Sequence, residues 1–170
     1  MIALLAIAGS DSAGAGQVSE SAMSEDEQRM HERLVALTEG AGSVSDLHIE
    51  FMDGSMVSHR SVHIEAGELV SKEWKSPGSP MIHLEGRVTD ARVSELLRRL
   101  IAEQYWTFQG TRFVPDAPTF LFRFYYGDLK YVDFSCDAAE FQDSPARTRI
   151  RDLFVRFLSD TELTSVPATP

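Results

Sequence analysis

Apolar and polar residues alternate between positions 44 and 87 with the period of two that is typical of β-strands. The first such segment, LHIEF at residues 47–51, leads into Asp53-Gly54, a favoured two-residue hairpin turn. The alternation resumes three more times, with turns expected at Ala66-Gly67 and within SPGSP at residues 76–80. These segments predict four consecutive antiparallel strands joined by hairpins.

Three other segments place apolar residues at the spacing of an α-helix. The first begins at the capping box Ser24–Glu27 and ends near Gly40, and its mostly polar composition predicts a peripheral helix. The second carries an apolar stripe over residues 93–101, and the third starts at Ser144-Pro145, a serine cap followed by proline in the first turn. Before the third helix, residues 119–136 alternate again and predict a further hairpin.

The order of these elements predicts an α+β fold. We expect an antiparallel sheet of about six strands built from hairpins (β-β-β-β-α-β-β-α), with two amphipathic helices on one face and the N-terminal helix at the periphery. The other face of such a sheet stays in contact with water. Residues 1–22 are expected to be a signal-like or disordered leader, 23–163 a single α+β domain and 164–170 a loose tail.

A histidine, an aliphatic residue and a glutamate follow one another three times within the predicted strands. The copies are His48-Ile49-Glu50, His63-Ile64-Glu65 and His83-Leu84-Glu85. On a strand, successive side chains point to opposite faces, so each His shares a face with its Glu and the aliphatic residue points the other way. If the aliphatic residues face the helices, the imidazoles and carboxylates face water.

Two interpretations of these histidines follow. Counting back from the Asp53-Gly54 turn places His48 across from His59, with His63 further along the same face. Imidazoles paired across strands beside glutamates can bind zinc, copper or another divalent metal. The candidate ligands for such a site are His48, His59, His63, Glu50 and Glu65. The other interpretation, which we prefer, is that they only supply the polar surface that the wet face of a sheet needs, without a cofactor.

The aromatic stretch at residues 105–118 is the one irregular segment suited to contacting a partner. It contains residue types that are enriched at interfaces, namely Trp106, Phe108, Arg112 and Phe113. The alternative is that these side chains close the core under the sheet edge. The sequence therefore favours a non-enzymatic domain that binds a protein or small ligand through the wet sheet face or this loop. A metal-binding protein or metal-dependent hydrolase is the alternative.

Composition narrows the choice of partner and chemistry. The 170-residue chain has a formal net charge of −10 and no cluster of Lys and Arg, which argues against nucleic acid as its main partner. An acidic inhibitor of a basic toxin or nuclease is a narrower form of the binding-domain hypothesis. The single Cys136 excludes an intramolecular disulfide. Because no G-x-S-x-G motif and no phosphate-binding loop occur, we predict no catalytic residue.

The N-terminal residues bear on where in the cell the protein is located. Residues 2–8 are apolar and small residues follow, with AIA and AGA sequences that resemble signal-peptidase sites, although no Lys or Arg precedes them. We favour export over a cytoplasmic location and keep both open. The apolar run is too short to cross a bilayer, which takes about 20 residues, so we predict no transmembrane segment.

The helix around residues 97–101 ends in an aromatic pair, Tyr105-Trp106, in the pattern L-x-x-L-[LI]…[FYW]-[FW]. With the paired hairpins before it and the proline-containing loop, hairpin and helix after it, this layout resembles a group of small bacterial α+β domains of unknown function, many of them exported. The resemblance covers about residues 45–160 and is one of topology more than of motif. It implies export and brings no catalytic residue with it.

Overall fold

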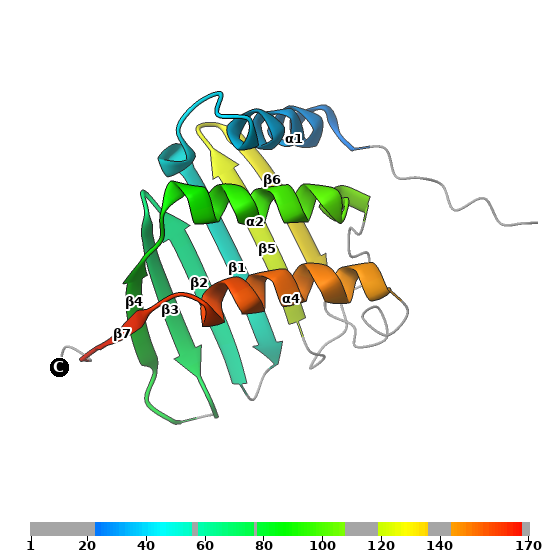
Figure 1. Cartoon of the computed structure of the whole chain (residues 1–170). Coiled ribbons are helices and arrows are strands. Elements are labelled where there is room, and N and C mark those ends of the chain that lie inside the picture. Colours follow the sequence, from blue (N-terminus) through cyan, green and yellow to red (C-terminus); the bar gives the residue numbers. More distant parts are fainter. Residues whose placement is uncertain (1–22, 56–57, 77, 108–118, 136–143, 168–170) are drawn as a thin grey trace, which may run out of the picture.

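The computed structural model describes residues 23–55, 58–76, 78–107, 119–135 and 144–167 (Figure 1). Within these residues the chain forms one antiparallel sheet of seven strands in the order β6-β5-β1-β2-β3-β4-β7. The α+β class and the hairpin-built antiparallel sheet are therefore confirmed. The strands are β1 (Leu47–Ser55), β2 (Ser58–Glu65), β3 (Glu68–Trp74), β4 (Ile82–Arg87), β5 (Thr119–Tyr126), β6 (Leu129–Ser135) and β7 (Leu163–Val166).

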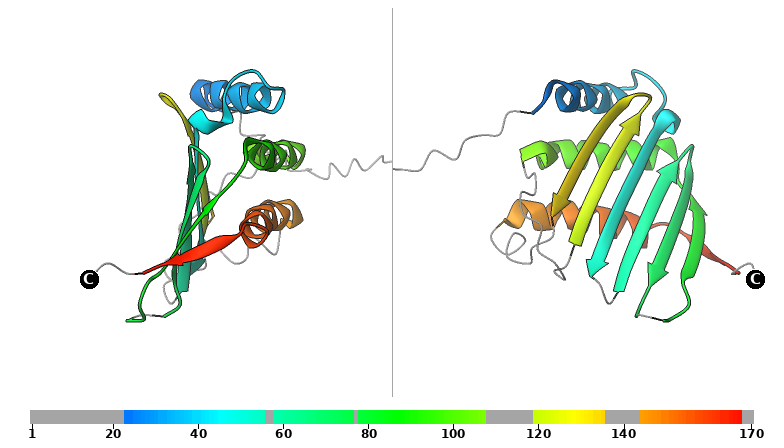
Figure 2. Two further views of the ribbon diagram at one scale, coloured as in Figure 1. Left: turned by 60° about the vertical axis from the view of Figure 1, so that its left-hand side comes forward. Right: turned by 180° about the vertical axis from the view of Figure 1, so that it is seen from behind.

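The three α-helices of the described residues lie on one side of this sheet, as the edge-on view in Figure 2 shows. They are α1 (Glu25–Thr38), α2 (Asp90–Ala102) and α4 (Pro145–Ser159), and two short 3₁₀ helices, η1 (Val44–Asp46) and η2 (Tyr105–Thr107), lie between elements. The predicted caps form, since Ser24 and Glu27 make the reciprocal capping box and Ser144 accepts a hydrogen bond from the Arg147 amide. Among the described residues, no helix combines the length and apolar character needed to cross a membrane.

The helix α1 packs at the periphery, over the edge strand β6, as its polar composition predicts, and it still buries its apolar residues. Its three apolar residues Met30, Leu34 and Leu37 are at most 2% exposed. They share one stripe of the helix, and that stripe packs against β6 and α2. A short apolar stripe is enough to bury a helix when it covers sheet area that α2 and α4 leave uncovered.

The aliphatic and aromatic residues of each strand point to the helices, as the alternation predicts. In β1, Leu47, Ile49 and Phe51 are at most 2% exposed, and the same holds for Phe120, Phe122 and Phe124 in β5. The alternate residues of each strand form the uncovered side, here called the open face, which is seen from behind in Figure 2. Its described residues include His48, Glu50, Met52, His59, Ser61, His63, Glu65, Val70, Lys72, His83, Glu85, Leu121, Arg123, Tyr125, Lys130 and Val132.

The turn between β1 and β2 lies further along the chain than predicted. Asp53-Gly54 belongs to β1, and the strands pair through Ser55 with Ser58. A Cβ at Gly54 would lie 2.4 Å from the His59 Cα, so this glycine allows two strands to approach closely and does not form the turn. Asp53 is held on the helix side by Arg151, whose Nε and Nη2 each donate to a carboxylate oxygen at 2.9 Å. This ion pair favours strand over turn at Asp53.

In the observed register each residue stays on its predicted face of the sheet, but the residues that lie opposite one another differ from the prediction. Gly54 lies opposite His59 and Glu50 lies opposite His63, so the predicted pairing of His48 with His59 is wrong. The displacement is an even number of residues, and the histidines therefore remain on one face. The turn at Ala66-Gly67 forms where expected, with His63 opposite Val70.

The predicted loose tail is partly wrong, because Leu163–Val166 form the edge strand β7 beside β4. Sequence pattern gives little signal for this strand, which is four residues long and mostly exposed. The closest approach is at Gly86, where an added Cβ would lie 2.5 Å from the Glu162 carbonyl oxygen. Glycine is required there because the backbone of the incoming chain occupies the side-chain space.

Replacing Gly86 with Ala is expected to displace β7 and to lower the free energy of unfolding by about 1–3 kcal/mol, the usual cost of overpacking. The readout is hydrogen exchange at residues 163–166, which should accelerate, together with urea denaturation. Glu85→Ala is the matched control on the same strand, since the Glu85 side chain is 53% exposed. Unchanged exchange in Gly86→Ala would show that β7 does not depend on this close approach.

Candidate metal centre

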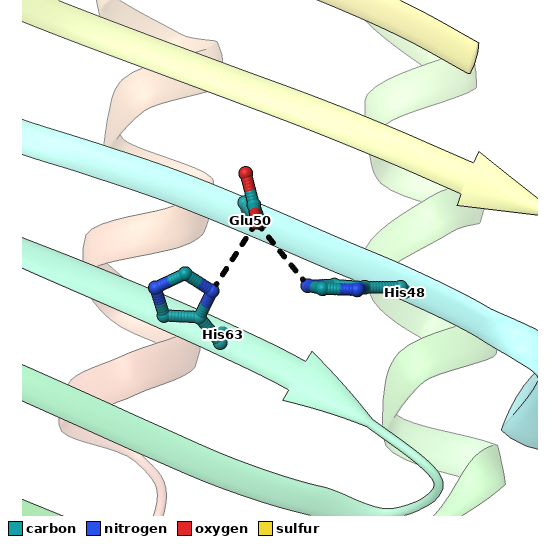
Figure 3. Close-up of side chains that lie close together, drawn as sticks. All are labelled: His48, Glu50 and His63. Atoms are coloured by element: carbon teal, nitrogen blue, oxygen red, sulfur yellow. Dashed lines mark ion pairs between the residues drawn. The ribbon is translucent and has the colours of Figure 1, made fainter.

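Two strands of the open face bring together two imidazoles and one carboxylate, the His–Glu cluster of His48, Glu50 and His63 (Figure 3). Glu50 Oε1 lies 3.5 Å from His48 Nε2 and 3.4 Å from His63 Nδ1. The three potential ligand atoms all lie within 4.8 Å of one another. His48 and Glu50 share β1 two residues apart, and the register of β1 with β2 adds His63 directly opposite Glu50.

The cluster is half-buried although it lies on the uncovered side of the sheet. The exposed fractions of the side chains are 28% for His48, 19% for Glu50 and 43% for His63. The Tyr125 ring stands beside the His48 ring, with centroids 5.4 Å apart. Partial burial lowers the local dielectric and strengthens the attraction between Glu50 and any cation held beside it.

Two further charged residues, Arg123 and Glu65, lie beside the cluster. Arg123 Nη1 on β5 donates to Glu50 Oε2 at 3.2 Å, which leaves Oε1 directed at the imidazoles. Glu65 Oε2 lies 4.0 Å from His48 Nδ1, on the ring nitrogen that does not face Glu50. The Arg123 contact orients Glu50 from behind, as polar groups do around metal ligands, whereas Glu65 lies beyond hydrogen-bond distance of His48.

One nitrogen of the cluster is buried without a hydrogen bond to the described residues. His48 Nε2 is buried and finds no hydrogen-bond partner among the described residues, although Glu50 is close enough for an ion pair. A buried polar atom in that state costs about 1–3 kcal/mol relative to a satisfied one. A cation between Nε2 and the carboxylate would satisfy both.

The structure separates the other predicted ligands from this cluster. His59 lies across from Gly54 and Trp74 and is not part of the group of three. Glu65 is 71% exposed and approaches His48 from the outside. The third triplet forms a separate pair on β4, with His83 Nε2 3.3 Å from Glu85 Oε1.

Arg123 is the site residue that the sequence did not single out. Alternation along residues 119–126 placed it on the face opposite the phenylalanines, but nothing in the sequence said which strand lies beside β5. In the sheet, β5 pairs with β1 across a long sequence separation, and Arg123 lies opposite Glu50. Arg123 could have been identified as the basic residue that neutralises Glu50 only if the pairing of β5 with β1 had been known.

Of the predicted partner-binding residues, only Trp106 lies within the described part of the chain. Its ring packs on His31 of α1, with centroids 4.2 Å apart, and on Tyr105 at 5.3 Å. Trp106 therefore contributes to closing the core beside α1. Phe108, Arg112 and Phe113 lie outside the described residues, as do residues 1–22 and Cys136.

His31 gives the fold a dependence on pH. Its Nδ1 lies 3.3 Å from the hydroxyl of the fully buried Tyr105, whose own pKa is raised by burial. Burial also lowers the pKa of His31, against a smaller opposing effect of Glu32. The unfolded state thus binds the proton more readily, so this contribution to stability is present above the unfolded value near 6.5 and is lost as the pH falls below it.

We therefore expect the free energy of unfolding to fall between about pH 7.5 and 5, and to fall less in the variant His31→Gln. Urea denaturation of both proteins at the two pH values measures the difference. His59→Gln serves as the control for a histidine that lies on the open face. Equal pH dependence in wild type and His31→Gln would contradict this assignment.

A concave feature lies between α2 and α4, on the helical side. It is a groove of about 270 Å³ lined by residues that include Arg92, Leu96, Arg156 and Phe157. Arg92 already donates to the carbonyl oxygens of Asp160 at 2.8 Å and Phe157 at 3.2 Å, and so caps the end of α4. These contacts assign Arg92 to helix packing, whereas the His–Glu cluster has potential ligand atoms directed at a common point.

Comparison with models of protein families and with curated proteins finds no match for this chain. The resemblance to exported bacterial domains therefore stays a prediction, as does export itself.

Proposed function

We propose that this domain binds a divalent transition-metal ion, zinc before others, through His48, Glu50 and His63. The observation that carries the proposal is the convergence of three ligand atoms of the right chemistry within 4.8 Å. Two imidazoles and one carboxylate form one of the zinc-binding sets that leave a fourth coordination position open.

The distances suit zinc with small side-chain movements. Tetrahedral bonds of about 2.0–2.1 Å to imidazole nitrogen and about 2.0–2.2 Å to carboxylate oxygen place neighbouring ligand atoms about 3.3–3.5 Å apart. Glu50 Oε1 is 3.5 Å from His48 Nε2 and 3.4 Å from His63 Nδ1, so both distances that involve the carboxylate already agree. The imidazole nitrogens lie within 4.8 Å of each other, and the 43% exposed His63 ring is the one that burial constrains less in moving toward His48.

The surroundings support a binding role over a catalytic one. Catalytic sites are usually concave and enclose most of their ligand, whereas the cluster lies on a sheet face where Arg123 is 38% exposed. A metal ion held there fits the non-enzymatic binding domain expected from the sequence. The open face then supplies the binding surface, and a hydrolase is the second candidate because the fourth position is open to water.

Zinc titration of the purified full chain by calorimetry, after removal of metal with chelator, tests the proposal. We expect one zinc per chain, and loss of that binding in the double variant His48→Ala/His63→Ala. His83→Ala is the matched control, since His83 also pairs with a glutamate on the open face. Wild type that takes up no zinc, cobalt or copper would overturn the proposal, and so would equal zinc affinity in wild type and the double variant.

A further inference from the structure

The three protein ligands leave one side of the proposed metal exposed to solvent. Within the described residues, the group that could hold a metal contains three side chains only. Glu65 does not supply a fourth ligand as it stands, because it approaches Nδ1 of His48 and not the nitrogen that faces Glu50. A zinc ion with three protein ligands completes its coordination with water or an external ligand.

Arg123 lies beside the cluster, opposite Glu50 on the neighbouring strand β5. Its Nη1 donates to Glu50 Oε2, the carboxylate oxygen that does not face the imidazoles. The guanidinium has five N–H donors, and its side chain is 38% exposed. Its Nε is buried without a hydrogen-bond partner among the described residues. Among its donors, Nη1 is the one that is directed at Glu50.

With a metal in place, two cations would flank a single carboxylate. Glu50 would then balance a divalent ion on Oε1 and the guanidinium on Oε2, while the imidazoles are neutral as ligands. Even with the 71% exposed Glu65 counted, two carboxylates would face three positive charges. This arrangement leaves an excess of positive charge on one side of the cluster. Partial burial, with Glu50 only 19% exposed, weakens screening by solvent and so favours an anion there.

We infer that the open coordination position takes the carboxylate of a small molecule, with one oxygen on the metal and the other on Arg123. The inference rests on the proposed metal site. A carboxylate suits the two cations because its negative charge is shared by two oxygens about 2.2 Å apart, so that one oxygen can bind the metal while the other accepts a charged hydrogen bond from the guanidinium. Tyr125, beside His48, and Leu121, on the same strand as Arg123, offer an apolar surface to the body of the ligand.

Cobalt(II) in place of zinc makes the test spectroscopic. The full chain is loaded with saturating cobalt, and the visible absorption of the metal is followed during titration with sodium acetate, with sodium chloride as the control for ionic strength. We expect acetate to change the cobalt spectrum in a saturable manner. We expect Arg123→Gln to weaken the acetate response by about 10-fold, the size expected for a lost charged hydrogen bond.

Two further variants test whether the acetate response depends on Arg123 in particular. Arg60→Gln removes an arginine that pairs with a glutamate, Glu73, at 3.2 Å but lies outside the cluster, and should respond to acetate as wild type does. Arg123→Lys keeps the charge without the fork and should lie between wild type and Arg123→Gln. If Arg123→Gln does not fold, the lysine variant carries the comparison.

Failure of the proposed metal site and failure of the carboxylate inference give different results. An absent cobalt spectrum in wild type, with no uptake of zinc or copper in the calorimetric titration, overturns the proposed metal site itself. A cobalt spectrum that acetate does not change, or changes equally in wild type and Arg123→Gln, leaves the metal site standing and overturns the carboxylate.

Discussion

Glu50→Gln is expected to lower the zinc affinity of the domain by at least about 100-fold, more than the 10–100-fold that loss of an outer-shell partner costs. Glu50 Oε1 is the one atom close to both imidazoles, at 3.5 and 3.4 Å. Glutamine keeps the shape of the side chain and its oxygen can still accept from Arg123, but the negative charge that attracts the cation is lost. Calorimetric titration with zinc measures the change directly.

A second measurement of the same variant uses stability. Metal that binds only the folded state stabilises it by about 2.7 kcal/mol at 100 times the dissociation constant. Zinc should therefore raise the melting temperature of wild type and leave that of Glu50→Gln nearly unchanged. Glu85→Gln is the control, since Glu85 pairs with His83 on the open face at 3.3 Å. If Glu85→Gln weakened zinc binding as strongly as Glu50→Gln, the ligand assignment would be wrong.

The sequence was sufficient for the layers of this fold because side-chain alternation records burial directly. Phe120, Phe122 and Phe124 alternate with polar or smaller residues, and the structure buries all three against the helices. The same parity placed the histidines and glutamates together on the open face. Parity survives an error in register when the shift is even, which is why the face was correct although the turn was misplaced.

Register and long-range pairing were not accessible in this way. The position of the β1–β2 turn depends on Arg151 of α4, which holds Asp53 from a distance of 98 residues along the chain. The neighbourhood of β5 and β1 depends on how two hairpins meet, and it alone brings Arg123 to Glu50. The preferred sequence interpretation, a merely polar surface, lacked these contacts between distant residues and so gave no reason to single out three side chains from five.

The edge strand β7 shows a different limit. Its residues Leu163–Val166 have little apolar pattern of their own, since one side faces solvent and the strand pairs on one edge only. The position of β7 depends on free space beside the neighbouring strand β4. This strand carries glycine at position 86, where the chain passes at Glu162 and Leu163. The sequence of residues 163–166 alone cannot show that the neighbouring strand lacks a side chain at the point of contact.

Phe122→Ala is expected to lower the free energy of unfolding by about 3–5 kcal/mol, the usual cost of truncating a buried phenylalanine. The ring is 1% exposed and lies at the centre of the aromatic core. Its centroid lies 5.3 Å from that of Phe154 on α4, 5.6 Å from Phe124 and 5.9 Å from Tyr131 on β6. Alanine would leave a cavity between the sheet and α4 that these large rings cannot close without leaving their own contacts. Urea denaturation measures the loss.

Leu121→Ala is the matched control because it lies on the same strand but on the open face. With solvent on that side, truncation leaves no enclosed cavity, and we expect a cost below about 1.5 kcal/mol. The contrast tests the architecture on which the metal site depends. If Leu121→Ala cost as much as Phe122→Ala, both faces of the sheet would be covered in solution, by a second copy of the chain or by segments outside the described residues. The His–Glu cluster would then be enclosed, and its fourth coordination position would belong to whatever covers it.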